Sequence, residues 1–170
     1  MNDPYQPNKF ESYRHFVYGV VRQTEPENVL EIGLGHGTTA FQIIKALGEI
    51  GKGKYYVIEL TPHLNLIEHF TPEQYQVIQG DSHNPETYVG LPLFDIICID
   101  GDHSEGGVYR DIYTSFPYLA ENGLFIFHDT NSPDVRRGIV NGAFQGNLEY
   151  FFFPEFYVGV ARKKRFDYDA

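Results

Sequence analysis

The fold of this chain is decided by the stretch Val29-Leu30-Glu31-Ile32-Gly33-Leu34-Gly35-His36-Gly37-Thr38-Thr39. It begins in a short apolar run, residues 28–32, of the kind that forms a buried strand in a parallel sheet. From Thr38 the apolar residues recur at the spacing of one helix face. Glycines join the strand to the helix at Gly33, Gly35 and Gly37. Because bare backbone can approach a ligand closely and the N–H groups of a helix start point into such a turn, the stretch predicts a ligand-binding strand–turn–helix unit.

Two classes of ligand compete for this turn, and it could also be a plain connection without a ligand. A dinucleotide-binding turn has the spacing G-x-G-x-x-G, which would make the protein a nicotinamide-dependent oxidoreductase. Here the spacing is G-x-G-x-G, and the carboxylate of Glu31 before it would repel a pyrophosphate but suit the sulfonium and amino groups of S-adenosylmethionine. The form E-x-G-x-G-x-G-T resembles the first motif of class I S-adenosylmethionine-dependent methyltransferases. By this resemblance the cofactor would contact Glu31, Gly33, Gly35, Gly37 and Thr38.

Composition limits the classes of protein that this chain can be. Its 170 residues suit one domain, residues 1–170, in which residues 1–27 would form an N-terminal flap and helix. The net charge of −10 argues against binding to a nucleic acid backbone. The single cysteine, Cys98, allows no disulfide framework, which favours a reducing compartment. Since no stretch reads as a membrane span or a signal peptide, we expect a cytoplasmic protein that binds neither nucleic acid nor membrane.

Strands and helices alternate along the chain. Strands are predicted at residues 28–32, 54–60, 74–79, 93–100 and 124–128, and helices at about 10–23, from 38, at 61–70, from 84, at 108–119 and at 132–144. Two aromatic strands, 148–153 and 156–161, close the chain as an antiparallel pair. This order predicts an α/β fold, namely a Rossmann-like doubly wound, mostly parallel seven-stranded sheet with helices on both faces and a C-terminal antiparallel hairpin. Strand 93–100, the most apolar, should be central, and the aromatic stretch 150–153 should lie in the core, with a dimer edge as the alternative.

Polar side chains of interest fall where each predicted parallel strand ends. They are Glu31, Glu59, Asp81, Asp100 and the pair His128-Asp129. In α/β folds the ligand lies beyond the carboxyl ends of the strands, near the reversal of strand order. Glu59 would accept hydrogen bonds from two ribose hydroxyls, and Asp81, with Ser82 beside it, would take the adenine amino group. Each of these acids could instead be an ordinary strand-end or turn residue.

The ends of the fourth and fifth strands carry a second group of polar residues. Carboxylates gathered in one place need a cation or a shared proton, so we predict a divalent metal bound by Asp100, His128 and Asp129. Oxygen ligands favour magnesium, whereas an imidazole leaves manganese, iron or zinc open. The alternative is that Asp100 only binds the cofactor, or caps the next helix, while His128 packs. His103 could take a proton from a substrate hydroxyl, and Asp102 could orient it or act as the base itself.

Residues 29–130 resemble the methyltransferase-24 family, a small family of class I methyltransferases. The most specific elements of the resemblance are Asp100-Gly101-Asp102-His103-Ser104, Gly107-Val108, Asp111 and His128-Asp129-Thr130. The family is similar to catechol and caffeoyl-coenzyme A O-methyltransferases and to the metal-dependent enzymes that tailor macrolide and aminocoumarin antibiotics. The resemblance implies metal ligands at Asp100 and His128-Asp129 and a base at His103. This chain departs from the family in lacking the aromatic of H-S-Y-E-G, and in having His128 and Thr130 where relatives carry a carboxylate or asparagine.

The sequence therefore predicts an S-adenosylmethionine-dependent O-methyltransferase that acts on a hydroxylated small molecule. A magnesium or manganese ion would bind the substrate hydroxyl and lower its pKa, and His103 would remove the proton. The cofactor methyl would then be attacked in line, with the two reactants held in register. A second subunit, in a homodimer, could complete the substrate pocket. The alternatives are a nicotinamide-dependent oxidoreductase and a non-catalytic homologue that keeps the cofactor.

Overall fold

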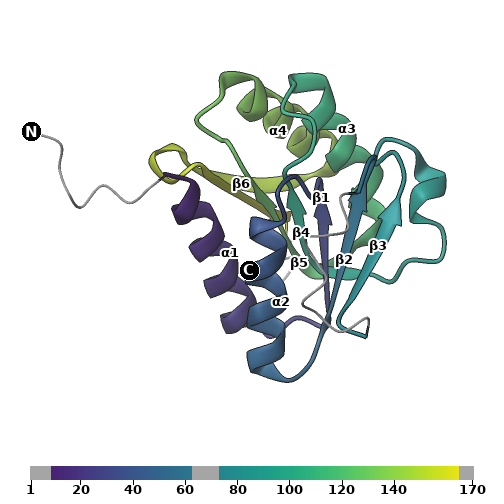
Figure 1. Cartoon of the computed structure of the whole chain (residues 1–170). Coiled ribbons are helices and arrows are strands. Elements are labelled where there is room, and N and C mark those ends of the chain that lie inside the picture. The colour runs from purple at the N-terminus through teal and green to yellow at the C-terminus, as the bar shows by residue number, and fades with distance from the viewer. Residues whose placement is uncertain (1–8, 63–72, 165–170) are drawn as a thin grey trace, which may run out of the picture.

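The computed structural model describes residues 9–62 and 73–164. In these segments seven strands form one sheet in the order β3-β2-β1-β4-β5-β7-β6 (Figure 1). Strands β1 to β5 pair in parallel, and β7 runs antiparallel to both β5 and β6. The strands are β1 (Asn28–Ile32), β2 (Lys54–Glu59), β3 (Tyr75–Gln79), β4 (Phe94–Ile99), β5 (Leu119–Phe127), β6 (Leu148–Phe153) and β7 (Val158–Lys163). The predicted Rossmann-like fold and its C-terminal antiparallel hairpin are confirmed.

Helices cover both faces of the sheet. On one face, α1 (Lys9–Thr24) and α2 (Thr38–Ile50) pack their apolar side chains against alternate strand residues such as Val29 and Val57. On the other face, α3 (Glu105–Ser115) and α4 (Pro133–Gly146) pack against the intervening residues such as Leu30 and Ile58. The short 3₁₀ helices are η2 (Pro85–Tyr88), η3 (Phe116–Tyr118) and η4 (Pro154–Phe156). This alternation buries both faces of the central strands, as the apolar runs in the sequence predict.

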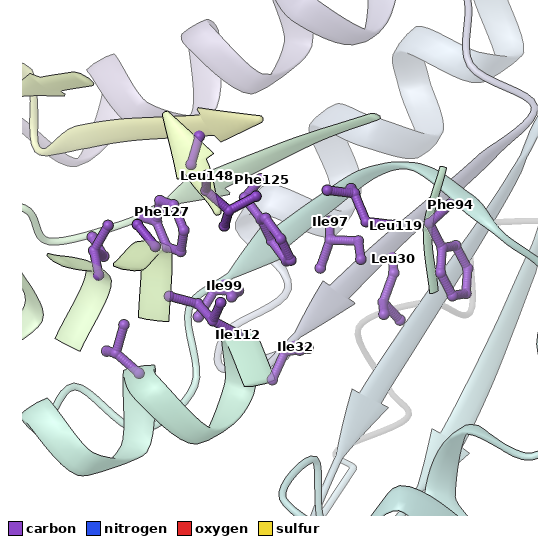
Figure 2. Packing of buried hydrophobic residues seen from close by; sticks show 14 of the residues in the cluster. Leu30, Ile32, Phe94, Ile97, Ile99, Ile112, Leu119, Phe125, Phe127 and Leu148 are labelled. Atoms are coloured by element: carbon purple, nitrogen blue, oxygen red, sulfur yellow. The ribbon is translucent and has the colours of Figure 1, made fainter. Parts of the chain in front are cut away.

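Strand β4 lies where the strand order reverses, between β1 and β5. Its residues Ile97 and Ile99 belong to the core under α3 and α4, whereas Ile96 and Cys98 belong to the core under α1 and α2. Figure 2 shows the first of these cores, with residues of β1, β4 and β5 packed side by side: Leu30, Ile32, Ile97, Ile99, Phe125 and Phe127. The prediction that this strand is central is confirmed.

Two predicted strand starts are wrong by more than one residue. Strand β5 begins at Leu119 rather than Leu124, because a register shift between Phe94 and Ile96 lets Leu119 pair with β4 ahead of a polar bulge. Strand β7 begins at Val158 rather than Phe156, because Pro154–Phe156 form a 3₁₀ turn that ends in Tyr157 at a φ of 60°. The predicted flap before the first helix and the body of the helix predicted at 61–70 lie outside the described residues.

The aromatic stretch 150–153 is only in part the core segment that its composition predicts, since Phe152 alone of its residues packs against the core. Phe151 and Phe153 are 61% and 43% exposed, because β6 is the outermost of the described strands and pairs with β7 alone among them. Leu148, at the start of β6, is the buried residue of this strand.

Among the described residues, no helix is both long enough and apolar enough to cross a lipid bilayer.

Candidate functional site

A cleft of about 580 Å³ opens at the carboxyl ends of β1, β2, β3 and β4. Its wall consists of the glycine turn after β1, the end of β2 and the loops at residues 80–83 and 100–102. It therefore lies at the reversal of strand order between β1 and β4, the position where doubly wound sheets bind ligands.

The glycine turn needs its glycines for two different reasons. Gly33 has a φ of 88°, and a Cβ at this position would lie 2.5 Å from the carbonyl oxygen of Asp100. Gly35 has a φ of 47°, and a Cβ there would meet nothing within 4 Å. Gly33 thus lets the turn lie against the end of β4, whereas Gly35 presents bare backbone to the cleft. Gly37, at a φ of 68°, precedes Thr38 at the start of α2, which has no side-chain cap.

Glu59 connects the end of β2 to the glycine turn. Its Oε2 accepts a hydrogen bond from the Leu34 N–H at 2.8 Å, and its Oε1 accepts one from the Thr61 N–H at 3.1 Å. Burial acts to raise the pKa of Glu59, but the hydrogen bonds from Leu34 and Thr61 outweigh it, and the pKa is lowered. The cleft therefore contains an ionised carboxylate at the position predicted for ribose binding.

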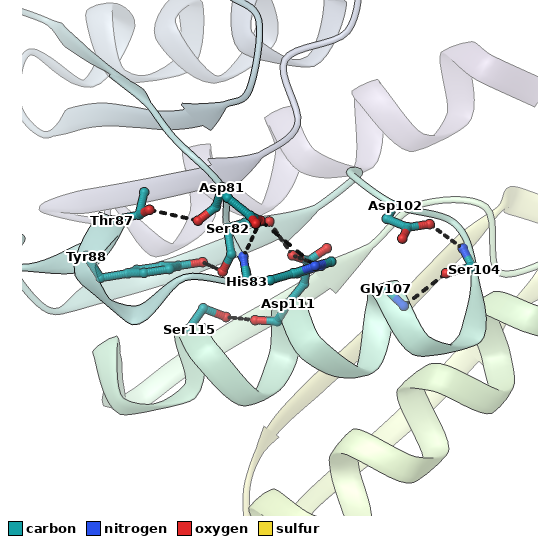
Figure 3. Close-up of polar contacts among 10 residues, drawn as sticks. All are labelled: Asp81, Ser82, His83, Thr87, Tyr88, Asp102, Ser104, Gly107, Asp111 and Ser115. Atoms are coloured by element: carbon teal, nitrogen blue, oxygen red, sulfur yellow. Dashed lines mark hydrogen bonds and ion pairs between the residues drawn. The ribbon is translucent and has the colours of Figure 1, made fainter.

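The loop after β3 turns one predicted cofactor ligand toward the cleft and another away from it. The side chain of Asp81 lines the cleft and is 56% exposed. The Ser82 hydroxyl instead donates to Asp111 Oδ1 on α3 at 2.6 Å (Figure 3). The hydroxyl proton of Ser82 is thus directed into the protein, although the residue borders the cleft.

Glu31 lies under the glycine turn and is not among the residues that line the cleft. Its side chain is buried on the α1–α2 face, where Oε2 accepts a hydrogen bond from the Tyr55 hydroxyl. Burial raises the pKa of Glu31 well above its usual range, and the nearby charges of Asp100 and Glu59 add to this effect. The observed contact of Glu31 is with Tyr55, and its contact with a cofactor stays a prediction.

The structure brings together the polar residues predicted at the ends of β4 and β5. Asp100 Oδ1 lies 2.9 Å from His128 Nδ1 and 3.2 Å from His103 Nε2. Asp129 Oδ2 lies 3.2 Å from His103 Nδ1 and 3.6 Å from His128 Nδ1. The ligand atoms of Asp100, His103 and His128 all lie within 4.8 Å of one another, a spacing that a metal ion could bridge. That this cluster binds a metal stays a prediction.

The charges in this cluster depend on one another. Burial acts to raise the pKa of Asp100, but hydrogen bonds to His103 and His128 outweigh it and lower the pKa. The pKa of His103 is raised, chiefly by its hydrogen bond to Asp100, against the opposing effect of burial. Asp100 is also a wall of the cleft, so the cluster and the cleft share a residue.

Asp102 lies beside the cluster but faces α3. Its Oδ1 accepts a hydrogen bond from the Ser104 N–H at 2.9 Å, which lowers the pKa of Asp102 (Figure 3). A Cβ at Gly107 would lie 2.2 Å from the Asp102 carboxyl carbon, so Gly107 makes room for this acid. The structure thus places the Asp102 carboxylate against the start of α3, and its role as orienter or base stays a prediction.

Three residues at the site were given no role by the sequence. The ring of Tyr13 on α1 packs on that of His128, with 4.3 Å between centroids, and Tyr55 binds Glu31. Asp111 is buried on α3 and binds Ser82. A signal for Asp111 was present, because an acid stands on the helix face that carries Val108 and Ile112.

Comparisons with known proteins agree with this geometry. A family profile described as a methyltransferase domain, methyltransferase-24, matches residues 30–130. The structure of the Podospora anserina methyltransferase PaMTH1, bound to S-adenosylhomocysteine, is similar, with a TM-score of 0.69, 17% identity, and coverage of 94% of this chain and 89% of that one. No curated protein gives a sequence match to this chain.

Two further solved structures share the fold. The MycE methyltransferase in complex with Mg, S-adenosylhomocysteine and mycinamycin VI has a TM-score of 0.70 and 18% identity, with coverage of 99% of this chain and 57% of MycE. An O-methyltransferase family protein from Burkholderia thailandensis has a TM-score of 0.72 and 10% identity, with coverage of 90% of this chain and 56% of that one. The profile match covers more than half of the 170 residues, so the chain belongs to the methyltransferase-24 family of class I S-adenosylmethionine-dependent methyltransferases.

Proposed function

We propose that this chain is an S-adenosylmethionine-dependent O-methyltransferase that uses a divalent metal to methylate a hydroxyl of a small molecule. The observation that carries the proposal is the double position of Asp100, which lines the glycine-turn cleft and belongs to the cluster with His103 and His128. A methyl donor in the cleft would thus lie next to an acceptor at the cluster.

The residues of the cleft fit the cofactor. Each oxygen of the Glu59 carboxylate accepts one backbone hydrogen bond and keeps a second lone pair, so both can accept from the vicinal hydroxyls of a ribose. Asp81 is exposed in the same cleft, at a place suited to an adenine amino group. Bare backbone at Gly35 leaves room for the amino acid end of the cofactor. The spacing typical of a pyrophosphate site, with a third glycine after two intervening residues, is missing from the turn.

The residues of the cluster fit a divalent metal. Asp100, His128 and Asp129 would hold it, with Asp100 Oδ1 at 2.9 Å and Asp129 Oδ2 at 3.6 Å from His128 Nδ1, and their mixed oxygen and nitrogen donors are compatible with magnesium or manganese. When bound, the cofactor supplies an electrophilic methyl group and the metal lowers the pKa of a hydroxyl that contacts it. His103 has a side chain that is 47% exposed, and it would accept the proton of a substrate hydroxyl on a ring nitrogen released from Asp100 or Asp129, which contact its two nitrogens in the structure. The carboxylates of Asp100 and Asp129, on either side of the ring, would stabilise the imidazolium that results.

Methyl transfer from isotope-labelled S-adenosylmethionine tests this proposal. The purified protein is incubated with catechol or with phenol, as acceptors that differ in the vicinal hydroxyl, with manganese or with a chelator. We expect label in the catechol product with manganese present and its loss with the chelator. If the chelator does not reduce methyl transfer, the proposed requirement for a divalent metal is wrong. If the protein binds the cofactor but transfers no label to any of a wider panel of hydroxylated acceptors, a non-catalytic homologue is favoured.

A homodimer is a second proposal for the same chain. The exposure of Phe151 and Phe153 on the outermost strand β6 supports it, since exposed aromatic edges are typical of association sites. Light scattering on the purified protein measures the oligomeric state, and a monomer at all concentrations would contradict the proposal.

A further inference from the structure

Asp111 is a fully buried acid directly below the cofactor cleft. It lies on α3, its exposed fraction is 0%, and within residues 9–62 and 73–164 its ion-pair partner is a histidine, His83, rather than a lysine or arginine. A carboxylate in such a place is unfavourable unless hydrogen bonds and charges compensate it. The groups around each oxygen of the Asp111 carboxyl therefore indicate its role.

One oxygen of Asp111 holds the loop after β3. Oδ1 accepts the Ser82 hydroxyl at 2.6 Å and lies 3.3 Å from His83 Nε2 (Figure 3), which is buried and has no hydrogen bond among the described residues. The backbone N–H of His83 in turn donates to Asp81 Oδ1 at 2.8 Å, and its ring lies between the carboxyls of Asp81 and Asp111. Asp111 is thus connected through Ser82 and His83 to Asp81, the loop residue whose exposed carboxyl lines the cleft.

The other oxygen of Asp111 lies under the loop after β4. A Cβ at Gly101 would be 3.3 Å from Asp111 Oδ2, so this oxygen lies close to the backbone that lines the cleft. Oδ2 is buried and has no hydrogen-bond partner among the described residues. A single carboxyl group therefore binds the Asp81 loop and lies close to the loop of Asp100 to Asp102.

We infer that Asp111 is a positioning residue for the cofactor: through Ser82 and His83 it fixes the loop after β3 so that Asp81 faces the cleft. The inference rests on the proposed function, since it assumes that the cleft binds S-adenosylmethionine. It also gives Ser82 an anchoring role in place of the contact with the cofactor that the sequence predicts. Charge-assisted hydrogen bonds of this kind are roughly twice as strong as neutral ones, so the ionised form of Asp111 should hold the loop best.

If Asp111 has this role, the affinity for the cofactor should depend on the protonation of its carboxyl group and therefore on pH. Burial raises the pKa of Asp111 to about 6, while the Ser82 hydrogen bond and the charge of His83 act against it. The other groups that face Asp111 are the acids Asp102 and Asp81, which raise its pKa, and Tyr88 of η2. Below a pH of about 6 the carboxyl is protonated, and its hold on Ser82 and His83 weakens.

The raised pKa of Asp111 also determines how the free energy of unfolding depends on pH. The pKa of Asp111 is raised from 3.8 in the unfolded chain to about 6, so the folded state binds the extra proton and the free energy of unfolding falls as the pH rises through this interval. An uncharged asparagine escapes this penalty and can still accept from Ser82. Asp111→Asn should therefore weaken cofactor binding without lowering stability above a pH of about 6, which a merely structural acid would not do.

Titration calorimetry with S-adenosylhomocysteine, together with denaturant unfolding, tests the inference. At a pH of about 7.5, Asp111→Asn should bind about tenfold more weakly than wild type, with an equal or higher free energy of unfolding. As the pH falls through about 6, the wild-type affinity should fall toward that of the variant, which stays flat. Ser82→Ala should also bind more weakly, but its effect should be smaller in the Asp111→Asn background than in wild type, because Asp111→Asn already weakens the link that Ser82→Ala removes.

Asp95→Asn is the matched control. Asp95 accepts backbone hydrogen bonds from Glu27 at 2.8 Å and Asn28 at 3.0 Å at the opposite end of the sheet, so its loss should lower stability and leave affinity unchanged. Equal affinity of wild type and Asp111→Asn, or an affinity difference that does not change with pH, would overturn the inference alone. If wild type itself bound no S-adenosylhomocysteine, the proposed function and this inference would fall together.

Discussion

Glu59 Oε2 accepts a hydrogen bond from the backbone N–H of Leu34 at 2.8 Å, and this bond ties the end of β2 to the glycine turn after β1. The second oxygen accepts the N–H of Thr61 at 3.1 Å. One carboxylate thus fixes the shape of the turn and also lines the cleft, so that turn geometry and the proposed cofactor binding involve the same side chain.

Glu59→Gln should weaken binding of S-adenosylhomocysteine by at least about tenfold, since an amide keeps one acceptor oxygen and hydrogen bonds to a charged group contribute about 1.5–3 kcal/mol. Titration calorimetry measures the change. Glu121→Gln is the control, because this acid is 85% exposed and contacts Lys163 on β7, away from the cleft. Unchanged affinity in Glu59→Gln would remove Glu59 from the cofactor site.

Gly33→Ala and Gly35→Ala should separate stability from binding. A methyl group added at Gly33 has no space beside the Asp100 carbonyl, so Gly33→Ala should lower the free energy of unfolding by about 2–4 kcal/mol. Gly35→Ala meets no neighbour within 4 Å and should cost about 1–2 kcal/mol for its positive φ, while reducing cofactor affinity by intruding on the cleft. Denaturant unfolding and calorimetry measure the two effects, and equal stability losses would contradict the close approach at Gly33.

Glu31 should make the protein less stable at high pH. Its pKa is raised well above 4.5 in the fold by burial, so the folded state keeps a proton that the unfolded chain releases, and stability falls as the pH rises above the unfolded value. Glu31→Gln should therefore be at least as stable as wild type at a pH of about 8, and each unit of upward shift corresponds to about 1.4 kcal/mol. Thermal unfolding of both proteins across the pH range measures this, and a variant that loses stability equally at every pH would show that Glu31 is ionised in the fold.

His103→Gln should reduce turnover strongly, by about 10²–10⁴-fold, while leaving cofactor affinity nearly unchanged, because general base catalysis contributes factors of this size. Labelled methyl transfer gives the turnover and calorimetry gives the affinity. His15→Gln, an exposed change on α1, serves as the control. Turnover that survives the loss of His103 at every pH would show that another group accepts the proton.

The sequence predicts the sheet because its central strands are buried on both faces. Runs such as residues 96–99 are apolar whichever face each residue points to, and the alternation with helices leaves few possible orders. The first half of β5 escaped prediction because Glu121 and Asn122 at the bulge are exposed and polar. The aromatic residues of β6 were assigned to the core because composition does not tell an edge strand from a covered one.

The sequence predicts which residues form the site, but not the directions in which their side chains point. Parallel strands end at one edge, so Asp100, His128 and Asp129 had to come together. Glu31 and Glu59 look equivalent in sequence, yet Glu59 is the last residue of β2, whereas Glu31 comes before the last residue of β1 and pairs with Val57. The pleat therefore turns Glu31 toward α1 and α2, and a shift of one residue in register would reverse that.

A crystal structure of the protein soaked with S-adenosylhomocysteine and manganese tests the central claim most directly, which is that the cleft at the glycine turn holds the methyl donor beside a metal cluster. We predict the ribose hydroxyls on Glu59, the adenine beside Asp81, and an anomalous manganese peak between Asp100, His128 and Asp129. Density for the cofactor elsewhere on the molecule, or a manganese peak remote from Asp100, would contradict the account.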